Sequence, residues 1–230
     1  MKRSLTAIVP VYNEENFIYN SLVGLIKVNE INKILVVDDG SSDSTVEKIL
    51  EIMKTNEQVQ LFQLNKNKGK GGAIKSVFNK VDTDYVVIHD ADYEYDPSDI
   101  SKMYKELNNY TEDYFVIGSR FKNSSKVQLY FRTYYGNKIL SYIFSKIYNI
   151  KISDIATCYK LMPASYLKST YFTEDRFAIE VELVAKYLKY NSNIIEVPIN
   201  YKARSYEEGK KIKFSDGVKY LYTMVKFKYL

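Results

Sequence analysis

Two carboxylates follow an apolar run near the middle of the chain and could hold a divalent cation. The run 85–88 leads through His89 into Asp90-Ala91-Asp92. In a strand, residues two apart point to the same side, so Asp90 and Asp92 would face one spot just beyond its carboxyl end. Carboxylates about 4 Å apart repel by about 4 kcal/mol at an effective dielectric near 20. Mg²⁺ or Mn²⁺ removes this cost and can also hold a diphosphate. For the motif alone, the alternative is a solvated turn.

Two further polar segments follow apolar runs and could bind a nucleotide. They are Pro10-Val11-Tyr12-Asn13-Glu14-Glu15 and Asp38-Asp39-Gly40-Ser41-Ser42. The Tyr12 ring could stack on a nucleobase, and the Asp39 carboxylate could accept a hydrogen bond from a base or a ribose hydroxyl. The alternative is that Pro10, Asn13 and Gly40 only form turns, and that Ser41 or Ser42 only caps a helix.

Alternating strand and helix patterns in the first hundred residues would bring these segments together. Apolar runs predict strands over 5–11, 33–38, 59–64 and 85–90. Helical spacing predicts helices over 14–28, from Ser42 or Asp43 to 56, and, after the glycine-rich loop 67–72, through 78. Such units form a parallel sheet, which places ligands beyond the carboxyl ends of its strands. The fold class is therefore α/β, with a Rossmann-like, mostly parallel central sheet flanked by helices.

The second half of the chain is less regular. A strand is predicted over 115–118 and helices over 127–149, 177–190 and 214–229. The strand predicted over 194–201 contains Pro198, which favours an edge position or a bulge. The expected apolar stripes are Phe131, Tyr135, Ile139, Ile143 and Ile147 in the first helix and Phe214, Val218, Leu221 and Val225 in the last. Without repeats or linkers, one domain over 1–230 is the simplest organisation.

Charge is distributed unevenly and indicates an anionic partner. The chain of 230 residues carries a net charge of +5. Residues 202–230 contain eight basic and three acidic residues, and residues 114–153 contain seven basic and no acidic residues. Both regions are rich in aromatic side chains, which suits phosphates or a membrane surface. No known RNA-binding signature accompanies the charge, so no nucleic-acid partner is expected.

Cysteine and hydropathy favour a cytoplasmic protein. A single cysteine, Cys158, excludes an internal disulfide, and without a Cys or His cluster a zinc site is not expected. The apolar run after Met1 is too short for a signal peptide, and no stretch reaches about 18 apolar residues. His89, the only histidine, is predicted to be a packed core residue.

Taken in order and spacing, the motifs resemble the family 2 glycosyltransferases, which have the GT-A fold and use nucleotide sugars. The motifs that carry this resemblance are 9–15, 36–45, 67–71 and 90–92. The segments 118–120, 154–160, 176–182 and 201–212 further resemble the dolichol-phosphate mannose synthase branch, which includes prokaryotic polyprenyl-phosphate glycosyltransferases. One departure is Gly209-Lys210-Lys211-Ile212, where some mannose synthases carry Gly-x-Ser-Lys. The sugar is therefore left open.

The resemblance implies roles for individual residues. The expected nucleotide-sugar-binding residues are Pro10, Tyr12, Asn13, Glu14, Asp39, Gly40, Lys70, Asp90, Ala91 and Asp92. Asp90, Asp92 and Glu94 are the expected ligands of Mg²⁺ or Mn²⁺. Arg120, Arg132, Arg204 and Lys211 are expected to bind the donor diphosphate and the acceptor phosphate, and together with Asp92 they form the expected catalytic set. Residues 1–120 would form the nucleotide-sugar half, and 121–230 the acceptor-binding and interfacial half.

The resemblance also implies a reaction. An inverting displacement would move a hexose from a GDP-mannose- or UDP-glucose-type donor to a polyprenyl phosphate. A phosphate monoester has its second pKa near 6, so it needs no strong general base. The alternative acceptor is a saccharide hydroxyl, which needs a carboxylate base, with Asp154 and Glu180 as candidates. A phosphoacceptor receiver domain is a distant alternative, because its acidic pair follows the first strand and Asp38-Asp39 follows the second.

A lipid acceptor requires contact with a membrane. The helices predicted over 127–149 and 214–229 combine lysine or arginine with aromatic side chains, as interfacial helices do. The alternative is that both are core helices with solvated lysines. The expected location is cytoplasmic, peripheral on the inner face of the membrane, and the sequence leaves the oligomeric state open.

Overall fold

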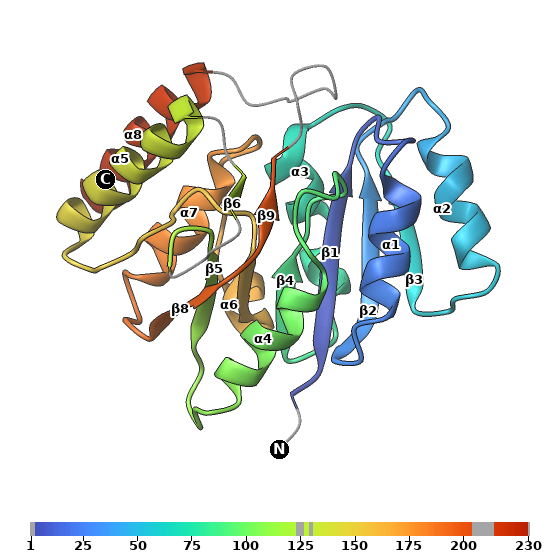
Figure 1. Cartoon of the computed structure of the whole chain (residues 1–230), viewed down its shortest axis with the longest axis horizontal. Coiled ribbons are helices and arrows are strands. Elements are labelled where there is room, and N and C mark those ends of the chain that lie inside the picture. Colours follow the sequence, from blue (N-terminus) through green and yellow to red (C-terminus); the bar gives the residue numbers. More distant parts are fainter. Residues whose placement is uncertain (1–2, 123–126, 129–130, 204–213, 230) are drawn as a thin grey trace.

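A computed structural model describes residues 3–122, 127–128, 131–203 and 214–229 (Figure 1). The strands are β1 Leu5–Val11, β2 Ile31–Asp38, β3 Val59–Gln63, β4 Tyr85–Ile88, β5 Phe115–Ser119, β6 Val127–Gln128, β7 Lys160–Pro163, β8 Ile194–Pro198 and β9 Tyr201–Lys202. The helices are α1 Ile18–Ile26, α2 Thr45–Met53, α3 Gly69–Ser76, α4 Ser98–Leu107, α5 Phe131–Tyr148, α6 Ala164–Ser169, α7 Ile179–Tyr187 and α8 Phe214–Tyr229, with a 3₁₀ turn over Phe78–Lys80. These elements confirm the predicted α/β class.

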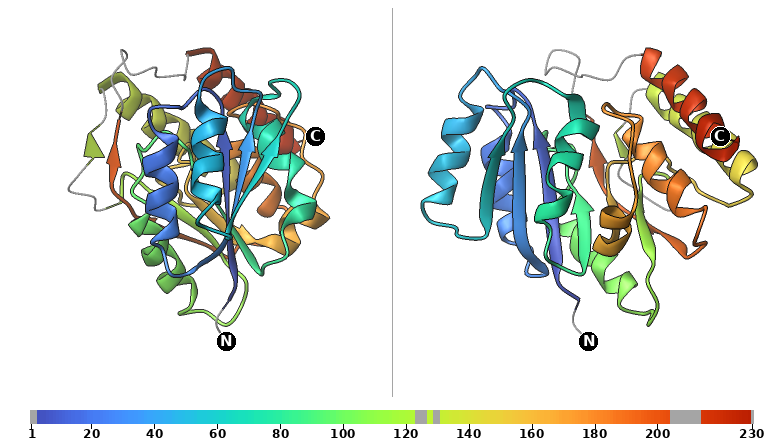
Figure 2. Two further views of the ribbon diagram at one scale, coloured as in Figure 1. Left: turned by 90° about the vertical axis from the view of Figure 1, so that its right-hand side faces the viewer. Right: turned by 180° about the vertical axis from the view of Figure 1, so that it is seen from behind.

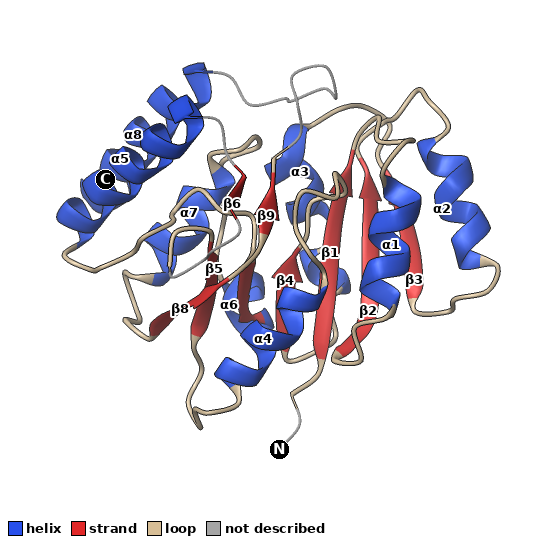
Figure 3. Cartoon of the chain, in the orientation of Figure 1, coloured by secondary structure: helices blue, strands red, loops and turns tan. Residues whose placement is uncertain are grey.

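Seven of the described strands form one sheet in the order β3-β2-β1-β4-β7-β5-β8, and β6 and β9 form a second, two-stranded sheet (Figure 3). β1 pairs in parallel with both β2 and β4, and β2 pairs in parallel with β3. The register sets Val11 beside Asp38 and Ile8 beside Ile88. The carboxyl ends of β1, β2 and β4 therefore lie next to one another, as the sequence predicted.

Helices cover both faces of the sheet, which is why its strands are apolar on both sides. On one face, α1, α2 and α4 pack against alternate residues of β1 and β2, including Leu5, Ala7 and Val36. On the other face, α3, α6 and α7 pack against the intervening residues, including Ile8, Leu35 and Val37. Figure 2 shows the sheet between these two layers. Every residue of β4 is consequently buried.

Three elements in or against the central part of the sheet, β7, α4 and the short helix α6, were not predicted from the sequence. β7 pairs antiparallel with both β4 and β5, so it joins the two parallel parts of the sheet. Helix α4 buries Ile100, Met103, Tyr104 and Leu107 beneath it. The prediction of an edge position for the Pro198 strand is confirmed, because β8 stands at the end of the order of described strands.

Several predicted boundaries were wrong. α1 begins at Ile18 rather than at residue 14, and residues 127–128 form β6, which pairs with β9, rather than the start of α5. The predicted apolar stripes of the two late helices were only partly right. Ile143, Ile147 and Leu221 pack against the core, whereas Tyr135 and Ile139 of α5 are exposed. Helix α8 buries Tyr220, Thr223, Met224 and Phe227. Its Val218 and Val225 are exposed, because this helix packs inward with a different face.

The glycine-rich segment forms the first turn of α3 instead of a loop. Gly72 N donates a hydrogen bond to Asp175 O at 2.9 Å, so the chain before α7 lies directly on this turn. A Cβ on Gly71 would lie 2.3 Å from Glu174 O and 2.9 Å from Asp175 C. The glycine is therefore required by the close approach of two backbones.

Replacing Gly71 by alanine is expected to lower the free energy of unfolding by about 3 kcal/mol, because neither backbone can move away freely. Gly136→Ala is the matched control. A Cβ there meets nothing within 4 Å, and alanine in an exposed helix stabilises by up to about 1 kcal/mol. Urea denaturation of both variants gives the comparison. Equal stability of the two variants would contradict the close approach.

No helix in the described ranges is both long enough and apolar enough to cross a membrane.

Candidate active site

A pocket of about 490 Å³ opens beyond the carboxyl ends of β1, β2 and β4. It brings together most of the residues that the sequence predicted for the donor and the metal. Its lining includes Pro10, Tyr12, Glu14, Asp39, Lys70, Asp90, Ala91, Asp92 and Glu94. Tyr12 is 38% exposed, so its ring is accessible to a ligand. Such a convergence of polar groups in one concave site is typical of ligand-binding sites.

Asn13 and Gly40 shape the rim of this pocket and do not line it. Asn13 has φ +50°, and its side chain accepts a hydrogen bond from Ser42 N at 2.8 Å. Ser41 Oγ accepts the hydrogen bond of Asn13 N at 2.9 Å. Gly40 has φ +81°, a conformation that glycine adopts without strain. The turn interpretation therefore describes both residues, and these bonds join the two loops.

Asp39 connects the end of β2 to the start of α3. Its two carboxylate oxygens accept hydrogen bonds from Lys68 N at 2.7 Å and from Gly69 N at 2.8 Å. These donors lie at the start of α3, where backbone N–H groups have no acceptor within the helix itself. Burial raises the pKa of Asp39, and the two backbone bonds partly offset that rise. Asp39 also lines the pocket.

A row of alternating charges runs from the pocket into the core. Lys70 Nζ lies 2.6 Å from Asp90 Oδ1 and 2.6 Å from Glu180 Oε1. Glu180 Oε2 lies 2.7 Å from Lys160 Nζ, and the Lys160 side chain is fully buried. Lys160 also donates to the carbonyls of Ile155 and Thr157. Asp90, one of the expected metal ligands, is thus paired with a lysine.

Asp92 and Glu94 occupy the turn after β4. Asp92 Oδ1 accepts a hydrogen bond from Glu94 N at 3.2 Å, and Glu94 Oε2 accepts one from Tyr201 Oη at 2.5 Å. The described residues contain no group of three or more His, Cys, Asp or Glu side chains arranged to hold a metal ion. Mg²⁺ is commonly held by only one or two carboxylates together with substrate phosphates and water. The oxygen donors of Asp90 and Asp92 fit that pattern.

Arg120 is engaged by a buried carboxylate. Its Nε and Nη2 donate to Asp154 Oδ2 and Oδ1 at 2.7 and 2.8 Å, and its backbone N donates to Oδ2 at 3.0 Å. Arg120 is 4% exposed and Asp154 is fully buried. The guanidinium also lies 5.0 Å from the centroid of the Tyr201 ring. Arg120 is therefore set behind the pocket wall and is not among the residues that line the pocket.

The other predicted cations are only partly described. Arg132 lies in the first turn of α5, but its side chain is outside the described part of the structure. Arg204 and Lys211 lie outside the described residues. Their roles toward phosphate stay predictions.

Most of the pocket residues that the sequence did not single out come from the second half of the chain. They include Thr133, Arg176, Phe177, Tyr201 and Tyr220, and Tyr95 joins them from the turn after β4. Arg176 and Phe177 precede α7, within a segment that carried the family resemblance. That resemblance was the only signal for them in the sequence, because their position depends on the contact of 174–176 with α3.

His89 lies beneath the site as the packed core residue that was predicted. It is fully buried, and its Nε2 and Nδ1 lie 2.9 Å from Ser21 Oγ and Tyr159 Oη. Burial lowers the pKa of His89 to about 4. Between pH 6.5 and 4, the unfolded chain therefore binds a proton at this residue that the folded chain does not bind.

The free energy of unfolding is expected to fall as the pH drops from 6.5 toward 4. At pH 5 the contribution of His89 amounts to about 2 kcal/mol, from 1.36 kcal/mol per pKa unit. Urea denaturation at pH 7 and pH 5 in metal-free buffer measures it. Carboxylates also titrate in this range, so the control is His89→Gln. Between pH 7 and pH 5 this variant should lose about 2 kcal/mol less free energy of unfolding than the unsubstituted protein. Equal losses would contradict the lowered pKa.

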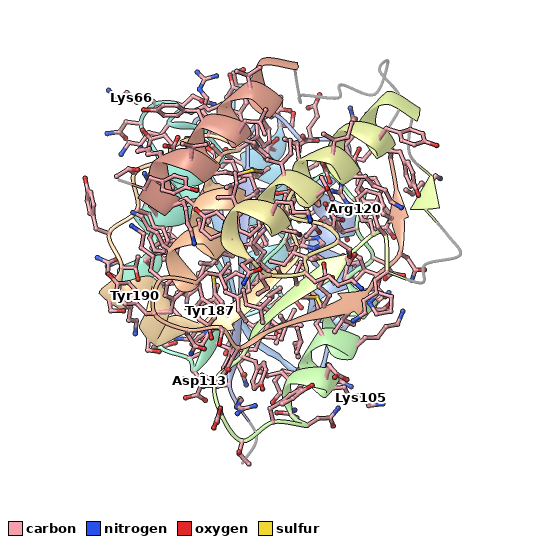
Figure 4. The ribbon with its side chains drawn as sticks, turned by 90° about the vertical axis from the view of Figure 1, so that its left-hand side faces the viewer. Lys66, Lys105, Asp113, Arg120, Tyr187 and Tyr190 are labelled. Atoms are coloured by element: carbon pink, nitrogen blue, oxygen red, sulfur yellow. The ribbon has the colours of Figure 1, made fainter. Side chains whose placement is uncertain are left out.

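A second cavity, of about 770 Å³, lies away from these residues. Its lining includes Asp113, Tyr166, Lys186, Tyr187 and Tyr190. Figure 4 shows Asp113, Tyr187 and Tyr190 well separated from Arg120. The larger cavity holds none of the predicted site residues, so the smaller pocket is the candidate active site.

The sequence matches the profile of Glycosyl transferase family 2 over residues 6–170. A UDP-N-acetylglucosamine–dolichyl-phosphate N-acetylglucosaminyltransferase from Methanococcus voltae is 29% identical, and the alignment covers 96% of this chain and 94% of the relative. A dolichol-phosphate mannosyltransferase from Pyrococcus furiosus is 30% identical, with 90% of this chain and 58% of the relative covered. The resemblance drawn from the sequence motifs is thereby confirmed.

Solved structures agree on the fold. Glucosyl-3-phosphoglycerate synthase from Mycobacterium tuberculosis, in complex with Mn²⁺, UDP and glucosyl-3-phosphoglycerate, superposes with a TM-score of 0.75. The identity is 16%, and 98% of this chain and 80% of that chain are covered. At this identity the likeness concerns the fold alone. The family match argues against the receiver-domain alternative. The chain belongs to glycosyl transferase family 2 and has the GT-A fold.

Proposed function

We propose that this protein transfers a hexose from a nucleotide-diphosphate sugar to a polyprenyl phosphate, with inversion and with the help of a divalent cation. The observation that carries the proposal is the pocket beyond β1, β2 and β4, where Tyr12, Asp39 and Asp92 meet. In this proposal the chain acts as one domain. Residues 1–120 bind the donor, and residues 121–230 bind the acceptor and the membrane.

The donor half follows from the residue types at the pocket. Tyr12 would stack on the base, Pro10 and Glu14 would border the base and the ribose, and Asp39 would accept a hydrogen bond from one of them. Asp90 and Asp92, with Glu94 beside them, would hold Mg²⁺ or Mn²⁺. When bound, the cation would neutralise charge on the departing nucleotide diphosphate. The Mycobacterium neighbour was crystallised with Mn²⁺ and UDP, which supports this donor chemistry.

The acceptor proposal is supported by the state of the two candidate bases. Asp154 is bound through both oxygens by Arg120, and Glu180 lies between Lys70 and Lys160. The oxygens of both carboxylates thus already contact cationic side chains, so neither carboxylate is placed to take a proton from an acceptor hydroxyl. A phosphate acceptor is already an oxyanion near neutral pH and needs no base. The dolichyl-phosphate substrates named for the relatives also favour a lipid phosphate.

A paired helix surface supports docking at a membrane. Tyr148 Oη of α5 donates to Met224 O of α8 at 2.9 Å, and Figure 1 shows the two helices side by side. Each helix presents an exposed apolar stripe: Tyr135, Ile139 and Tyr142 on α5, and Val218, Tyr222, Val225 and Tyr229 on α8. Lysines border both stripes, which suits an interface with anionic lipid. We propose that this surface makes the protein peripheral on the inner, cytoplasmic face of the membrane.

A transfer assay tests the reaction. The protein is incubated with Mn²⁺ or Mg²⁺, polyprenyl phosphate in detergent and, separately, labelled GDP-mannose, UDP-glucose and UDP-N-acetylglucosamine. Label in the organic phase supports the proposal and names the donor, which the pocket leaves open. Metal-dependent hydrolysis of a nucleotide sugar without a lipid product would favour a saccharide hydroxyl as the acceptor. Retention at the anomeric carbon, by NMR of the product, would contradict the single displacement.

Vesicle flotation tests the docking surface. The protein should float with vesicles that contain anionic lipid at low salt. Tyr142→Glu combined with Tyr222→Glu should remain at the bottom of the gradient. Sedimentation of the unsubstituted protein would remove the docking proposal and leave the transfer proposal standing.

A further inference from the structure

Lys70 forms an ion pair with Asp90, one of the carboxylates that we propose to hold the divalent cation. Its Nζ lies 2.6 Å from Asp90 Oδ1, and its side chain is only 9% exposed. Its Nζ also lies 2.6 Å from Glu180 Oε1, so two carboxylates flank the ammonium group. Lys70 thus places a positive charge beside Asp90, at the candidate metal site.

The backbone around Lys70 is fixed. Gly69, Gly71 and Gly72 surround it, and at Gly69 and Gly71 even a Cβ would collide with the backbone of Glu174 or Asp175. Asp39 holds the turn from the other side through Lys68 N and Gly69 N. Lys70 can therefore leave Asp90 only by moving its side chain, and α3 stays in place.

Glu180 is the second carboxylate that forms an ion pair with the same ammonium group. It lies 2.6 Å from Lys70 Nζ, but Lys160 already neutralises it from within the core. Lys160 therefore balances the charge of Glu180, and Lys70 balances the charge of Asp90 at the pocket. A cation bound at Asp90 would face the charge of Lys70 at short range, whereas an incoming diphosphate would offer Lys70 new oxygens.

We propose that Lys70 is a built-in counter-ion that competes with the divalent cation for Asp90, so that the cation binds together with the diphosphate and poorly before it. This inference rests on the proposed function for the identity of the diphosphate. The competition between Lys70 and the cation does not depend on that identity, because it follows from the ion pairs of Lys70 with Asp90 and Glu180. Binding of metal and of nucleotide would then be positively coupled, and by linkage each would strengthen the other by the same factor.

Mn²⁺ binding without nucleotide tests the competition. Free Mn²⁺ is followed by electron paramagnetic resonance in titrations of the protein and of Lys70→Met. The variant should bind Mn²⁺ at least about tenfold more tightly, because a positive charge near the site is gone. Unchanged or weaker binding would overturn the proposal. Lys70→Gln serves the same purpose if Lys70→Met does not fold, as judged by circular dichroism.

Three further variants make the result specific. Lys70→Arg keeps the charge and should bind Mn²⁺ within about twofold of the unsubstituted protein. Lys75→Met removes a lysine of the same helix that pairs with Asp175, and it should behave likewise. In Lys70→Met combined with Asp90→Asn, the tightening should disappear, since Asp90 is what the lysine and the metal share. A tightening that persists without Asp90 would overturn the competition.

Nucleotide titrations separate this inference from the proposed function. UDP or GDP should tighten Mn²⁺ binding in the unsubstituted protein, and this coupling should shrink in Lys70→Met. Equal coupling in both proteins would overturn the role of Lys70. If Lys70→Met tightens Mn²⁺ but neither nucleotide affects it, the competition stands and the nucleotide-sugar donor falls.

Discussion

Replacing Asp92 by asparagine is expected to lower kcat/KM for sugar transfer by about three orders of magnitude, or about 4 kcal/mol of transition-state stabilisation. Asp92 lines the pocket, and its Oδ1 accepts the hydrogen bond of Glu94 N. Asparagine can keep that bond, so the turn after β4 should be unchanged. What is lost is the negative charge that would hold the divalent cation. The transfer assay with labelled donor measures the loss, and urea denaturation should show unchanged stability.

Asp96→Asn is the matched control for Asp92→Asn. Asp96 is exposed, does not line the pocket, and accepts a hydrogen bond from Ser98 N at 2.9 Å at the start of α4. Its replacement removes the same charge a few residues away and should leave transfer within about twofold of the unsubstituted protein. If both variants lost activity equally, the loss would come from the change in the overall negative charge near the pocket and not from a metal ligand at position 92. If Asp92→Asn kept most of its activity, Asp92 would not be a metal ligand.

The parallel strands could be predicted because burial on both faces makes them continuous apolar runs. β1, β2, β3 and β4 were found within a few residues of their observed bounds. Their carboxyl ends follow from parallel pairing, so the convergence of Tyr12, Asp39 and Asp92 could also be predicted. The glycines of α3 were read as a loop because glycine disfavours helices. The structure shows that contact with 174–175 outweighs this tendency.

β7 and α4 were missed for different reasons. β7 consists of Lys160, Leu161, Met162 and Pro163, and its lysine is fully buried, so no local pattern marks it as a central strand. Pairing with β4 and β5 decides its conformation. Helix α4 carries an apolar spacing that was readable, since its buried residues recur at intervals of three and four.

The ion pairs of the site could not be predicted from the sequence. With 33 basic and 28 acidic residues, a charge has many candidate partners. Lys70 is twenty residues from Asp90 in sequence, and its other partner, Glu180, is far beyond. The tertiary structure selects these pairs, because it places α3 beside the carboxyl end of β4 and next to α7. The sequence therefore identified side chains that could take part in binding or catalysis. The structure identifies which of the charged ones neutralise one another.

Removing the carboxylate of Asp154 is expected to cost about 3–5 kcal/mol of unfolding free energy, because a buried arginine then loses the carboxylate that accepts three of its hydrogen bonds. Arg120 is 4% exposed, and Asp154 accepts three hydrogen bonds from it. Burial lowers the pKa of Arg120, but Asp154 outweighs that effect and holds it well above its ordinary value. Asp154→Ala therefore buries a charge that the arginine cannot shed. Urea denaturation measures the loss, and Arg120→Met combined with Asp154→Leu should recover most of it.

Variants of Asp154 also distinguish a lipid-phosphate acceptor from a saccharide-hydroxyl acceptor. Asp82→Ala, which removes the exposed acidic partner of Lys33, is the control and should change stability little, since ion pairs at the surface contribute little. If Asp154 is structural, as its geometry indicates, transfer by Asp154→Asn should fall only in step with the folded fraction. If Asp154→Asn instead folds with full stability and loses transfer alone, Asp154 acts on the acceptor. The acceptor would then need a base, and a saccharide hydroxyl would replace the lipid phosphate.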